Sequence, residues 1–151
     1  MLIGVISDTH GLLRPEALAA LAGVEHILHA GDVGNPAILE MLEEIAPMTA
    51  IRGNVDTAGE CALLPSTEAV MLGGKLFYLV HAIEDLDISP TAAGVSVVVY
   101  GHSHQAKVEQ RGSVLYLNPG SAGPRRFQLA VTLALVTVTA KCVETRIEQL
   151  L

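Results

Sequence analysis

The chain has 151 residues, half of them apolar, and a formal charge of −7 at neutral pH. This length fits one domain, which we expect to span residues 1–151, and the apolar content is enough for one substantial core. The acidic balance, with no Trp, two Phe and three Tyr, argues against a basic surface or an aromatic platform for nucleic acid, so we expect a small partner molecule.

The first half of the sequence predicts strands that alternate with helices. Pro15 and Pro36 stand where first helical turns are expected, and Asn35 is a suitable N-cap. This βαβαβ order predicts a parallel sheet. The patterns cover, in chain order, residues 2–7, 14–23, 26–30, 35–46 and 48–54.

The second half predicts hairpins instead. Residues 66–80 have the pattern of two strands joined at Gly73 and Gly74. Helix patterns become scarce, and there is no repeat, linker or low-complexity segment, so we predict one α/β domain. Further strand patterns cover residues 95–100, 105–111, 113–118, 127–139 and 141–150.

The chain begins MLIGVISDTH, which passes into a strand without a basic leader region, and no apolar run is long enough to cross a membrane. We therefore expect a cytoplasmic protein with no membrane partner. The loop sequences at 55–65, 82–94 and 119–126 do not identify a substrate, and the oligomeric state stays open, a homo-oligomer included.

Polar side chains follow six strand patterns where each strand ends. Ligands of open α/β sheets collect beyond the carboxyl ends of the strands, so we expect these side chains to meet on one rim. On an extended backbone, the i, i+2 pairs would each point in one direction. The residues are Asp8 and His10, Asp32, Asn54 and Asp56, His81, His102 and His104, and Asn118.

This set of side chains suits metal ions. Carboxylates, imidazoles and an amide without thiolate favour Mn²⁺, Fe²⁺, Zn²⁺, Co²⁺ or Ni²⁺, and the supply of ligands exceeds the need of one tetrahedral zinc. Asp32 has no ligand beside it in the sequence and suits a bridging role. Gly31, Gly53 and Gly101 each precede a candidate ligand, where the missing Cβ permits a close approach.

The series D-x-H, G-D, G-N, a single His and G-H-x-H, from Asp8 to His104, resembles the motifs of the calcineurin-like metallophosphoesterases. The trailing NPGSAGPRRF resembles their small single-domain bacterial and archaeal phosphodiesterase branch, which is related in fold to the retromer scaffold subunit. The resemblance implies a four-layer α/β/β/α sandwich of two mainly mixed sheets flanked by helices.

The resemblance also implies a phosphodiesterase that uses two divalent ions, with Mn²⁺ the first choice, to activate a water against a small phosphodiester. No protein nucleophile is then needed. Asn54 would also contact the substrate. One ion would be held by Asp8, His10, Asp32 and His104, and the other by Asp32, Asn54, His81 and His102.

The sequence departs from the family pattern at two positions. The broader family has a histidine after the asparagine of G-N, whereas Val55 stands here, which removes one general acid and disfavours monoesters with poor leaving groups. The small-domain branch shares this absence. Ala82 follows His81 where glycine is usual, and gives that backbone less freedom.

Other residues have two interpretations. Arg125 and Arg126 either bind the substrate phosphate or form an exposed basic turn. Asp56 either orients the site from behind the ligands or closes a turn. For His26 and His29 we expect solvated or core histidines rather than ligands.

Two rival functions use the same residues. An interaction scaffold like the retromer subunit would keep the fold and bind a protein through an apolar surface. An exonuclease would need a basic surface along which a strand could run, but the nine Lys and Arg residues are scattered. The presence of every ligand of the motif series favours the enzyme.

Overall fold

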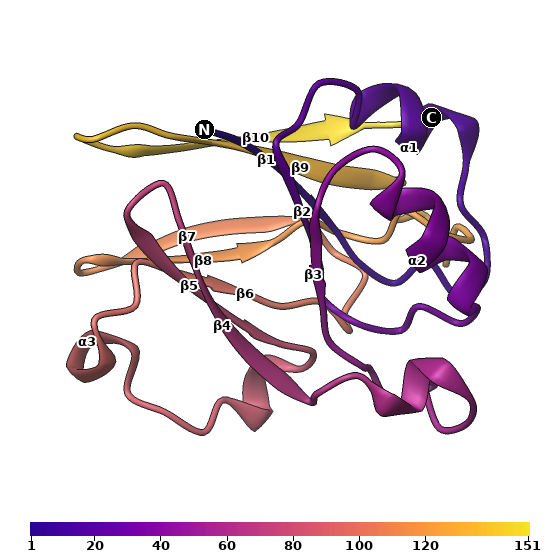
Figure 1. Cartoon of the computed structure of the whole chain (residues 1–151), viewed down its shortest axis with the longest axis horizontal. Helices are drawn as coiled ribbons and strands as arrows, with labels where there is room; N and C mark the ends of the chain where they lie inside the picture. The colour runs from indigo at the N-terminus through magenta and orange to yellow at the C-terminus, as the bar shows by residue number, and fades with distance from the viewer.

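The computed structural model describes all 151 residues and contains two five-stranded sheets (Figure 1). Three short α-helices and two 3₁₀ turns complete it. The strands are β1 (Leu2–Ile6), β2 (His26–His29), β3 (Met48–Ala50), β4 (Thr67–Leu72), β5 (Lys75–Val80), β6 (Val97–Val99), β7 (Lys107–Arg111), β8 (Val114–Asn118), β9 (Thr132–Val138) and β10 (Val143–Gln149). The helices are α1 (Pro15–Ala20), α2 (Pro36–Glu43) and α3 (Pro90–Ala93), and the 3₁₀ turns are Glu60–Leu63 and Ile83–Asp85.

The first sheet has the order β10-β9-β1-β2-β3. Strands β1, β2 and β3 are parallel, as the βαβαβ pattern predicts, and α1 and α2 connect them. Asn35 caps α2 as predicted, because its Oδ1 accepts a hydrogen bond from the backbone of Ala37. Strand β9 extends the sheet antiparallel to β1, and β10 pairs antiparallel to β9, so the sheet is mixed.

The second sheet has the order β4-β5-β6-β8-β7. Its centre, β5, β6 and β8, is parallel, and the edge strands β4 and β7 are antiparallel to their neighbours. The predicted hairpin is confirmed: Gly73 and Gly74 both have positive φ, at 59° and 82°, which is the conformation that a tight two-residue turn requires. This sheet is mixed as well.

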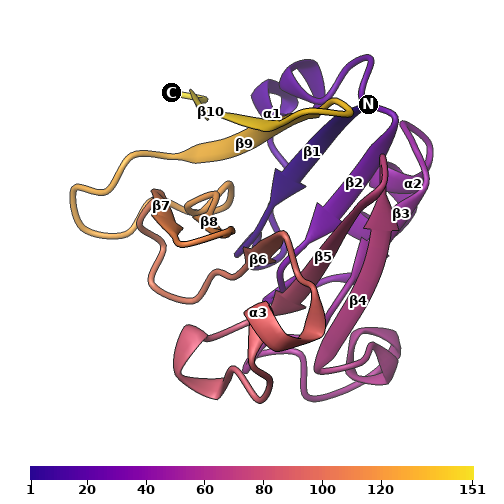
Figure 2. The ribbon, with the colours of Figure 1, turned by 90° about the vertical axis from the view of Figure 1, so that its left-hand side faces the viewer.

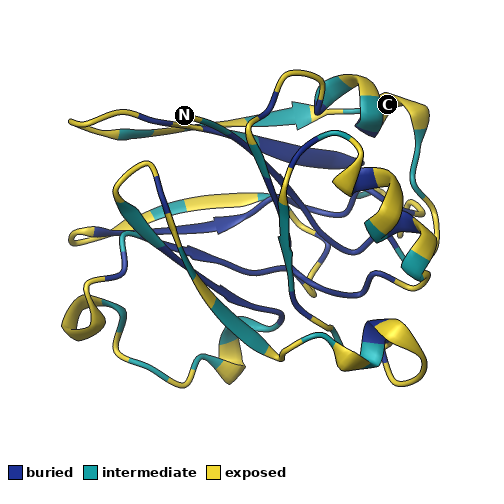
Figure 3. Ribbon diagram, viewed as in Figure 1, coloured by how far each residue is buried: buried dark blue, intermediate teal, exposed yellow.

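The core lies between the two sheets, and strand alternation explains it. Ile3 and Val5 on β1 point to the same inner layer as Phe77 and Leu79 on β5, and all four are fully buried. Their neighbour Ile6 points outward instead and packs under α1 and α2. Figure 3 shows the central strands β1, β6 and β8 as largely buried, while the edge strands, α3 and parts of α1 and α2 are intermediate or exposed.

The helical layers differ between the two sheets. Helices α1 and α2 cover the first sheet, and residues 83–95 cover the outer face of the second, where Ile83, Leu86 and Ile88 pack against Tyr78 and its neighbours. Figure 2 shows α3 toward the viewer and α1 and α2 on the far side. The predicted α/β/β/α order is confirmed, with a thin last layer.

None of the helices has the length and apolar character that crossing a membrane requires.

Several predicted boundaries are wrong. The strand expected at 127–139 begins only at Thr132, because Phe127 has a left-handed backbone with φ 54°, which a strand does not accept. The strand expected at 105–111 begins at Lys107, and the strand expected at 48–54 ends at Ala50. After Ala50 the chain leaves the sheet, and the Arg52 amide bonds to the carbonyl of Pro65.

Candidate metal centre

Side chains from both sheets meet beyond the carboxyl ends of the parallel strands, as we predict from sequence for the polar residues that follow these strands. They form two groups, within each of which the ligand atoms all lie within 4.8 Å of one another. The first group consists of Asp8, His10 and His104, which follow β1 and β6, and the second group of Asp32, His81 and His102, which follow β2, β5 and β6.

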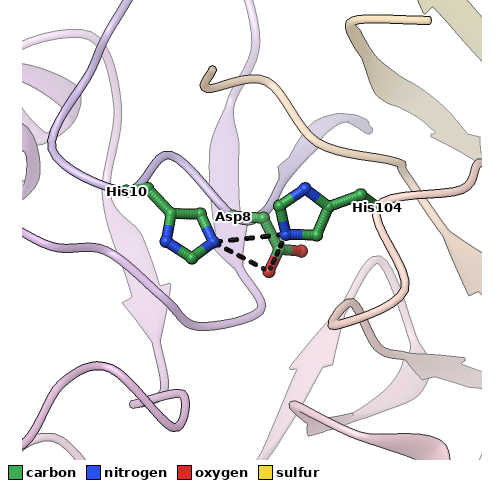
Figure 4. Close-up of side chains that lie close together, drawn as sticks. All are labelled: Asp8, His10 and His104. Atoms are coloured by element: carbon green, nitrogen blue, oxygen red, sulfur yellow. Dashed lines mark hydrogen bonds and ion pairs between the residues drawn. The ribbon is translucent and has the colours of Figure 1, made fainter. Parts of the chain in front are cut away.

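The first group is compact and largely buried (Figure 4). The Nε2 atoms of His10 and His104 lie 3.2 Å apart, and they lie 3.7 and 3.4 Å from Asp8 Oδ1. The other oxygen, Asp8 Oδ2, accepts hydrogen bonds from the Ser7 hydroxyl and the His102 amide. One carboxylate oxygen is therefore fixed by the protein, and the other faces two imidazole nitrogens.

Asp32 is arranged in the same way and links the two groups. Its Oδ1 accepts a hydrogen bond from the Val55 amide, whereas its Oδ2 lies 3.2 Å from His81 Nε2 in the second group and 3.4 Å from His10 Nε2 in the first. The His81 and His102 rings meet edge to face, with centroids 5.3 Å apart. Asp32 thus has the position that a bridging carboxylate would need.

Buried polar atoms without hydrogen-bond partners lie at the centre of this arrangement. They include Asp8 Oδ1 and His81 Nε2. His81 Nδ1 donates to the carbonyl of Ala30 at 2.7 Å, so Nε2 carries the free lone pair of the neutral ring. Unpaired buried acceptors that face one another are unfavourable without a positive charge between them. Nitrogen and oxygen donors of this kind fit divalent transition metals.

The comparisons with known proteins agree with this geometry. The family model of the calcineurin-like phosphoesterase superfamily domain matches residues 1–141. The chain belongs to the calcineurin-like phosphoesterase superfamily. It is 36% identical over 133 residues to a probable metallophosphoesterase of Methanothermobacter thermautotrophicus, covering 80% of this chain and 77% of the relative. It is 34% identical over 139 residues to the phosphodiesterase YfcE of Escherichia coli K12, covering 76% of each.

Solved structures share the fold over the whole chain. An archaeal phosphodiesterase superposes with a TM-score of 0.80 at 25% identity, covering 98% of this chain and 100% of that one. Vps29 of Entamoeba histolytica in complex with Zn²⁺ superposes with a TM-score of 0.74 at 21% identity, covering 100% of both. The Vps29 likeness concerns the fold alone. The family model and the two relatives confirm the predicted resemblance to this superfamily.

Burial and neighbouring groups set the protonation of the superfamily motif residues. Burial alone raises the pKa of Asp32, but His81 and the Val55 amide outweigh it and the pKa falls. Burial alone lowers the pKa of His81, but Asp32 and the Ala30 carbonyl raise it. Burial lowers the pKa of His104, which keeps that imidazole neutral and able to bind a cation.

The backbone at the ligands corrects one step of the sequence argument. Asp8, His10, Asp32, His102 and His104 all have left-handed backbones, with φ between 46° and 72°, so neither pair sits on an extended strand. Asp8 and His10 nevertheless join the same group, whereas His102 joins the second group and His104 the first, as the resemblance implies. Left-handed conformations cost non-glycine residues about 1–2 kcal/mol each, and here they coincide with the site.

The three glycines that precede ligands are needed for space. A Cβ at Gly53 would collide with Asp32 Oδ1, and a Cβ at Gly101 would collide with Ser7 Oγ and come within 2.6 Å of Asp8 Oδ2. A Cβ at Gly31, where φ is 101°, would lie 2.7 Å from His81 Nδ1. The missing Cβ is therefore needed at all three positions to make room for protein atoms, whereas the approach to an ion or phosphate that we expect from the sequence stays a prediction.

Asp56 orients the loop behind Asp32. It is buried, and its carboxylate accepts hydrogen bonds from the amides of Val33, Gly34 and Gly53. It thereby ties the loop after β2 to the loop after β3. Of the two interpretations left open by the sequence, the structure supports the orienting one.

His29 and Thr9 form a support that sequence reasoning missed. His29 is fully buried; its Nδ1 accepts from the Gly31 amide and its Nε2 lies 3.0 Å from the Thr9 hydroxyl, which donates to the Val33 carbonyl. This chain of bonds links the loops of Asp8 and Asp32. Burial lowers the pKa of His29 to about 4, so the ring is neutral. His29 is a core histidine, as expected, but nothing in its local sequence indicates that it links these two loops.

The loop that carries His102 and His104 is held from β8. Asn118 Nδ2 donates to the Gly101 carbonyl and the Ser103 hydroxyl, and Asn118 Oδ1 accepts from the Gly120 amide. His26 belongs to neither group of candidate ligands. It is half-buried, and its Nε2 lies 2.9 Å from the Thr49 hydroxyl.

The other predicted residues lie around the centre. Asn54 is exposed and lines a cavity of about 460 Å³ together with His81 and His102. The side chains of Arg125 and Arg126 are exposed and form no hydrogen bond or ion pair, although the charge of Arg126 contributes to the low pKa of His104. Both interpretations of this basic pair fit such exposure, so its contact with a substrate phosphate stays a prediction.

Proposed function

We propose that the chain is a metal-dependent phosphodiesterase that hydrolyses its substrate with water at a binuclear centre. The supporting observation is the position of Asp32 Oδ2 between His10 and His81, beside the unpartnered atoms Asp8 Oδ1 and His81 Nε2. Membership of the phosphoesterase superfamily and relatives named phosphodiesterase support the same reaction class.

The two groups define the proposed ligand sets. Asp32 is shared between the ions, and the other members divide as the first and second groups do. Asn54, next to His81 and His102 on the wall of the cavity, would complete the second set. The first ion would be held by Asp8, His10, Asp32 and His104, and the second by Asp32, Asn54, His81 and His102.

When bound, two divalent ions supply Lewis acidity, which lowers the pKa of water toward neutrality and stabilises the charge on phosphate oxygens. The residues of this chain hold and orient the reacting groups. Asp8 and Asp32 each keep one oxygen fixed by protein donors, so the orientation of the other oxygen is set before substrate arrives. Positioning of this kind supplies a large part of a rate enhancement.

Val55 favours diesters over monoesters in this proposal. Its side chain is partly exposed, and its amide is used by Asp32. It cannot donate a proton to a leaving oxygen, so good leaving groups are required. The substrate we propose is therefore a small phosphodiester; nucleic acid is not expected, because the nine Lys and Arg residues are scattered along a chain with a formal charge of −7.

Elemental analysis of the purified protein, followed by a phosphoester panel, tests the proposal. We expect two ions per chain after loading with Mn²⁺, hydrolysis of aryl phosphodiesters, and loss of activity with a chelator. Full activity with one ion per chain would contradict the binuclear centre. A stable protein partner combined with no turnover under any divalent metal would instead support the scaffold function.

A further inference from the structure

The cavity of about 460 Å³ opens directly beside the second group, and its far wall has no part in the hydrolysis proposed above. His81, His102 and Asn54 form the near wall. The 3₁₀ turn Ile83–Asp85, which begins two residues after His81, contributes to the other side. A substrate bound at the second group would therefore extend one of its arms into this cavity.

The cavity is unsuited to an apolar or aromatic arm. Val80 and Ala82 are the only apolar side chains that line it, and its only aromatic rings are the imidazoles of His81 and His102, which belong to the second group. A lipid chain would find little apolar surface to bury, and a nucleobase would find no Phe, Tyr or Trp ring on which to stack. The arm that fits is small and polar.

The charge of the lining is negative. Glu84, Asp85 and Asp87 face a single guanidinium, that of Arg52, which donates to the Leu64 carbonyl. Asp87 is held by a hydrogen bond of 2.6 Å from the Tyr78 hydroxyl. Glu84 and Asp85 are exposed, and their side chains form no hydrogen bond or ion pair.

A second observation points to a ligand at the near wall of this cavity. His81 lies on the wall of the cavity, is more than nine-tenths buried, and has an Nε2 atom without a hydrogen-bond partner. The cavity thus combines an incomplete polar centre at one end with free carboxylates at the other. A bound phosphate at the centre would direct its ester arm toward those carboxylates.

We propose that this cavity holds one arm of the phosphodiester and that Glu84 and Asp85 select an arm that carries an alkylammonium cation. The inference rests on the proposed function. Attraction between partly exposed charges is modest, so two carboxylates should favour the cationic arm about tenfold over a neutral arm of the same shape. The same carboxylates repel an anionic arm, and added salt weakens both effects.

Two probes of the same shape test this in the protein loaded with Mn²⁺. They are the p-nitrophenyl ester of phosphocholine and p-nitrophenyl 3,3-dimethylbutyl phosphate, in which a neutral carbon replaces the quaternary nitrogen. In both, water supplies the oxygen that replaces p-nitrophenolate on phosphorus, so only the charge of the arm differs. We expect kcat/KM about tenfold higher for the cationic probe at low salt, with the preference falling as salt is added.

The double variant Glu84→Gln/Asp85→Asn should bring the ratio of the two kcat/KM values close to one. The matched control is Glu43→Gln/Glu44→Gln, which removes two neighbouring exposed carboxylates at the end of α2 and should keep the wild-type ratio. Turnover of both probes with the same ratio in wild type and Glu84→Gln/Asp85→Asn overturns this inference and leaves the proposed function standing. No turnover of any diester under any divalent metal overturns both.

Discussion

The first and second groups contain the same kinds of side chain but differ in their access to solvent. In the first group Asp8 and His104 are almost fully buried, and the three donor atoms face one another. In the second group His102 is exposed and lines the cavity. In the proposed centre we therefore expect the first group to retain its ion and the second group to present its ion to the substrate.

Asp32→Ala should have the largest effect, because Asp32 is the one carboxylate shared by the groups in the proposed centre. We expect loss of both ions and a fall in kcat/KM of about 10³-fold or more, since the ions supply several kcal/mol of stabilisation. Elemental analysis and aryl diester kinetics measure this, with Glu43→Ala as the control. A variant that keeps two ions would remove Asp32 from its bridging role.

His104→Ala and His102→Ala should separate the two groups. Each variant should lose one ion and retain the other. The ion left in His102→Ala lies in the buried first group, so a chelator should remove it about tenfold more slowly than the ion left in His104→Ala. Equal removal rates would mean that the difference in burial does not control access.

Titration of His29, which links the loops of Asp8 and Asp32, should make the free energy of unfolding depend on pH. Its pKa is about 4 in the folded protein against 6.5 in the unfolded chain, so the unfolded state binds more protons between these values. The contribution of neutral His29 to the free energy of unfolding is therefore fully present above pH 6.5, and it falls by roughly 3 kcal/mol as the pH drops toward 4.

Urea unfolding of the metal-free protein across this pH range measures the effect, with His29→Asn as the variant that does not titrate. Asn can accept the Gly31 amide in place of Nδ1, so the variant keeps that bond. The wild type should lose more stability on acidification than His29→Asn. Identical pH slopes in the two proteins would show that His29 is not the group responsible.

Val55→His should have the smallest effect, because it adds a proton donor without removing a ligand. Val55 is 42% exposed, which leaves space for an imidazole. We expect kcat for an alkyl monoester to rise about tenfold relative to an aryl diester, part of what a positioned general acid contributes. Val55→Phe controls for ring size. If the wild type already cleaves alkyl monoesters as fast as aryl diesters, another residue donates the proton.

The sequence predicted the fold class and the meeting of the motif residues well, because both depend on short-range patterns. The alternation of strand and helix patterns in residues 2–54 predicts the parallel strands β1, β2 and β3, and Gly31, Gly53 and Gly101 mark the loops that follow β2, β3 and β6. These signals are local, so one chain is enough to find them.

The partners of the residues that support the site could not be predicted, because these contacts are tertiary; for Asp56 the sequence offered the orienting role only as one of two interpretations. The bond from His29 to Thr9 spans 20 residues, and the bond from Asp56 to the Val33 amide spans 23. No sequence motif marks either pair, and which residues bond depends on how the loops pack against one another. The left-handed backbone at Asp8 is set by the same neighbours, since the Asp8 amide bonds to the Gly31 carbonyl.

The left-handed backbone at five motif positions also bears on how such a fold can change over evolutionary time. Replacing His10, His102 or His104 by glycine would relieve backbone strain of about 1 kcal/mol while discarding a donor side chain. Asp8 and Asp32 differ, because their carboxylates also hold neighbouring loops through hydrogen bonds. A lineage released from the need to hydrolyse esters could therefore replace the three histidines, keep the sandwich and lose the side chains that the proposed reaction needs.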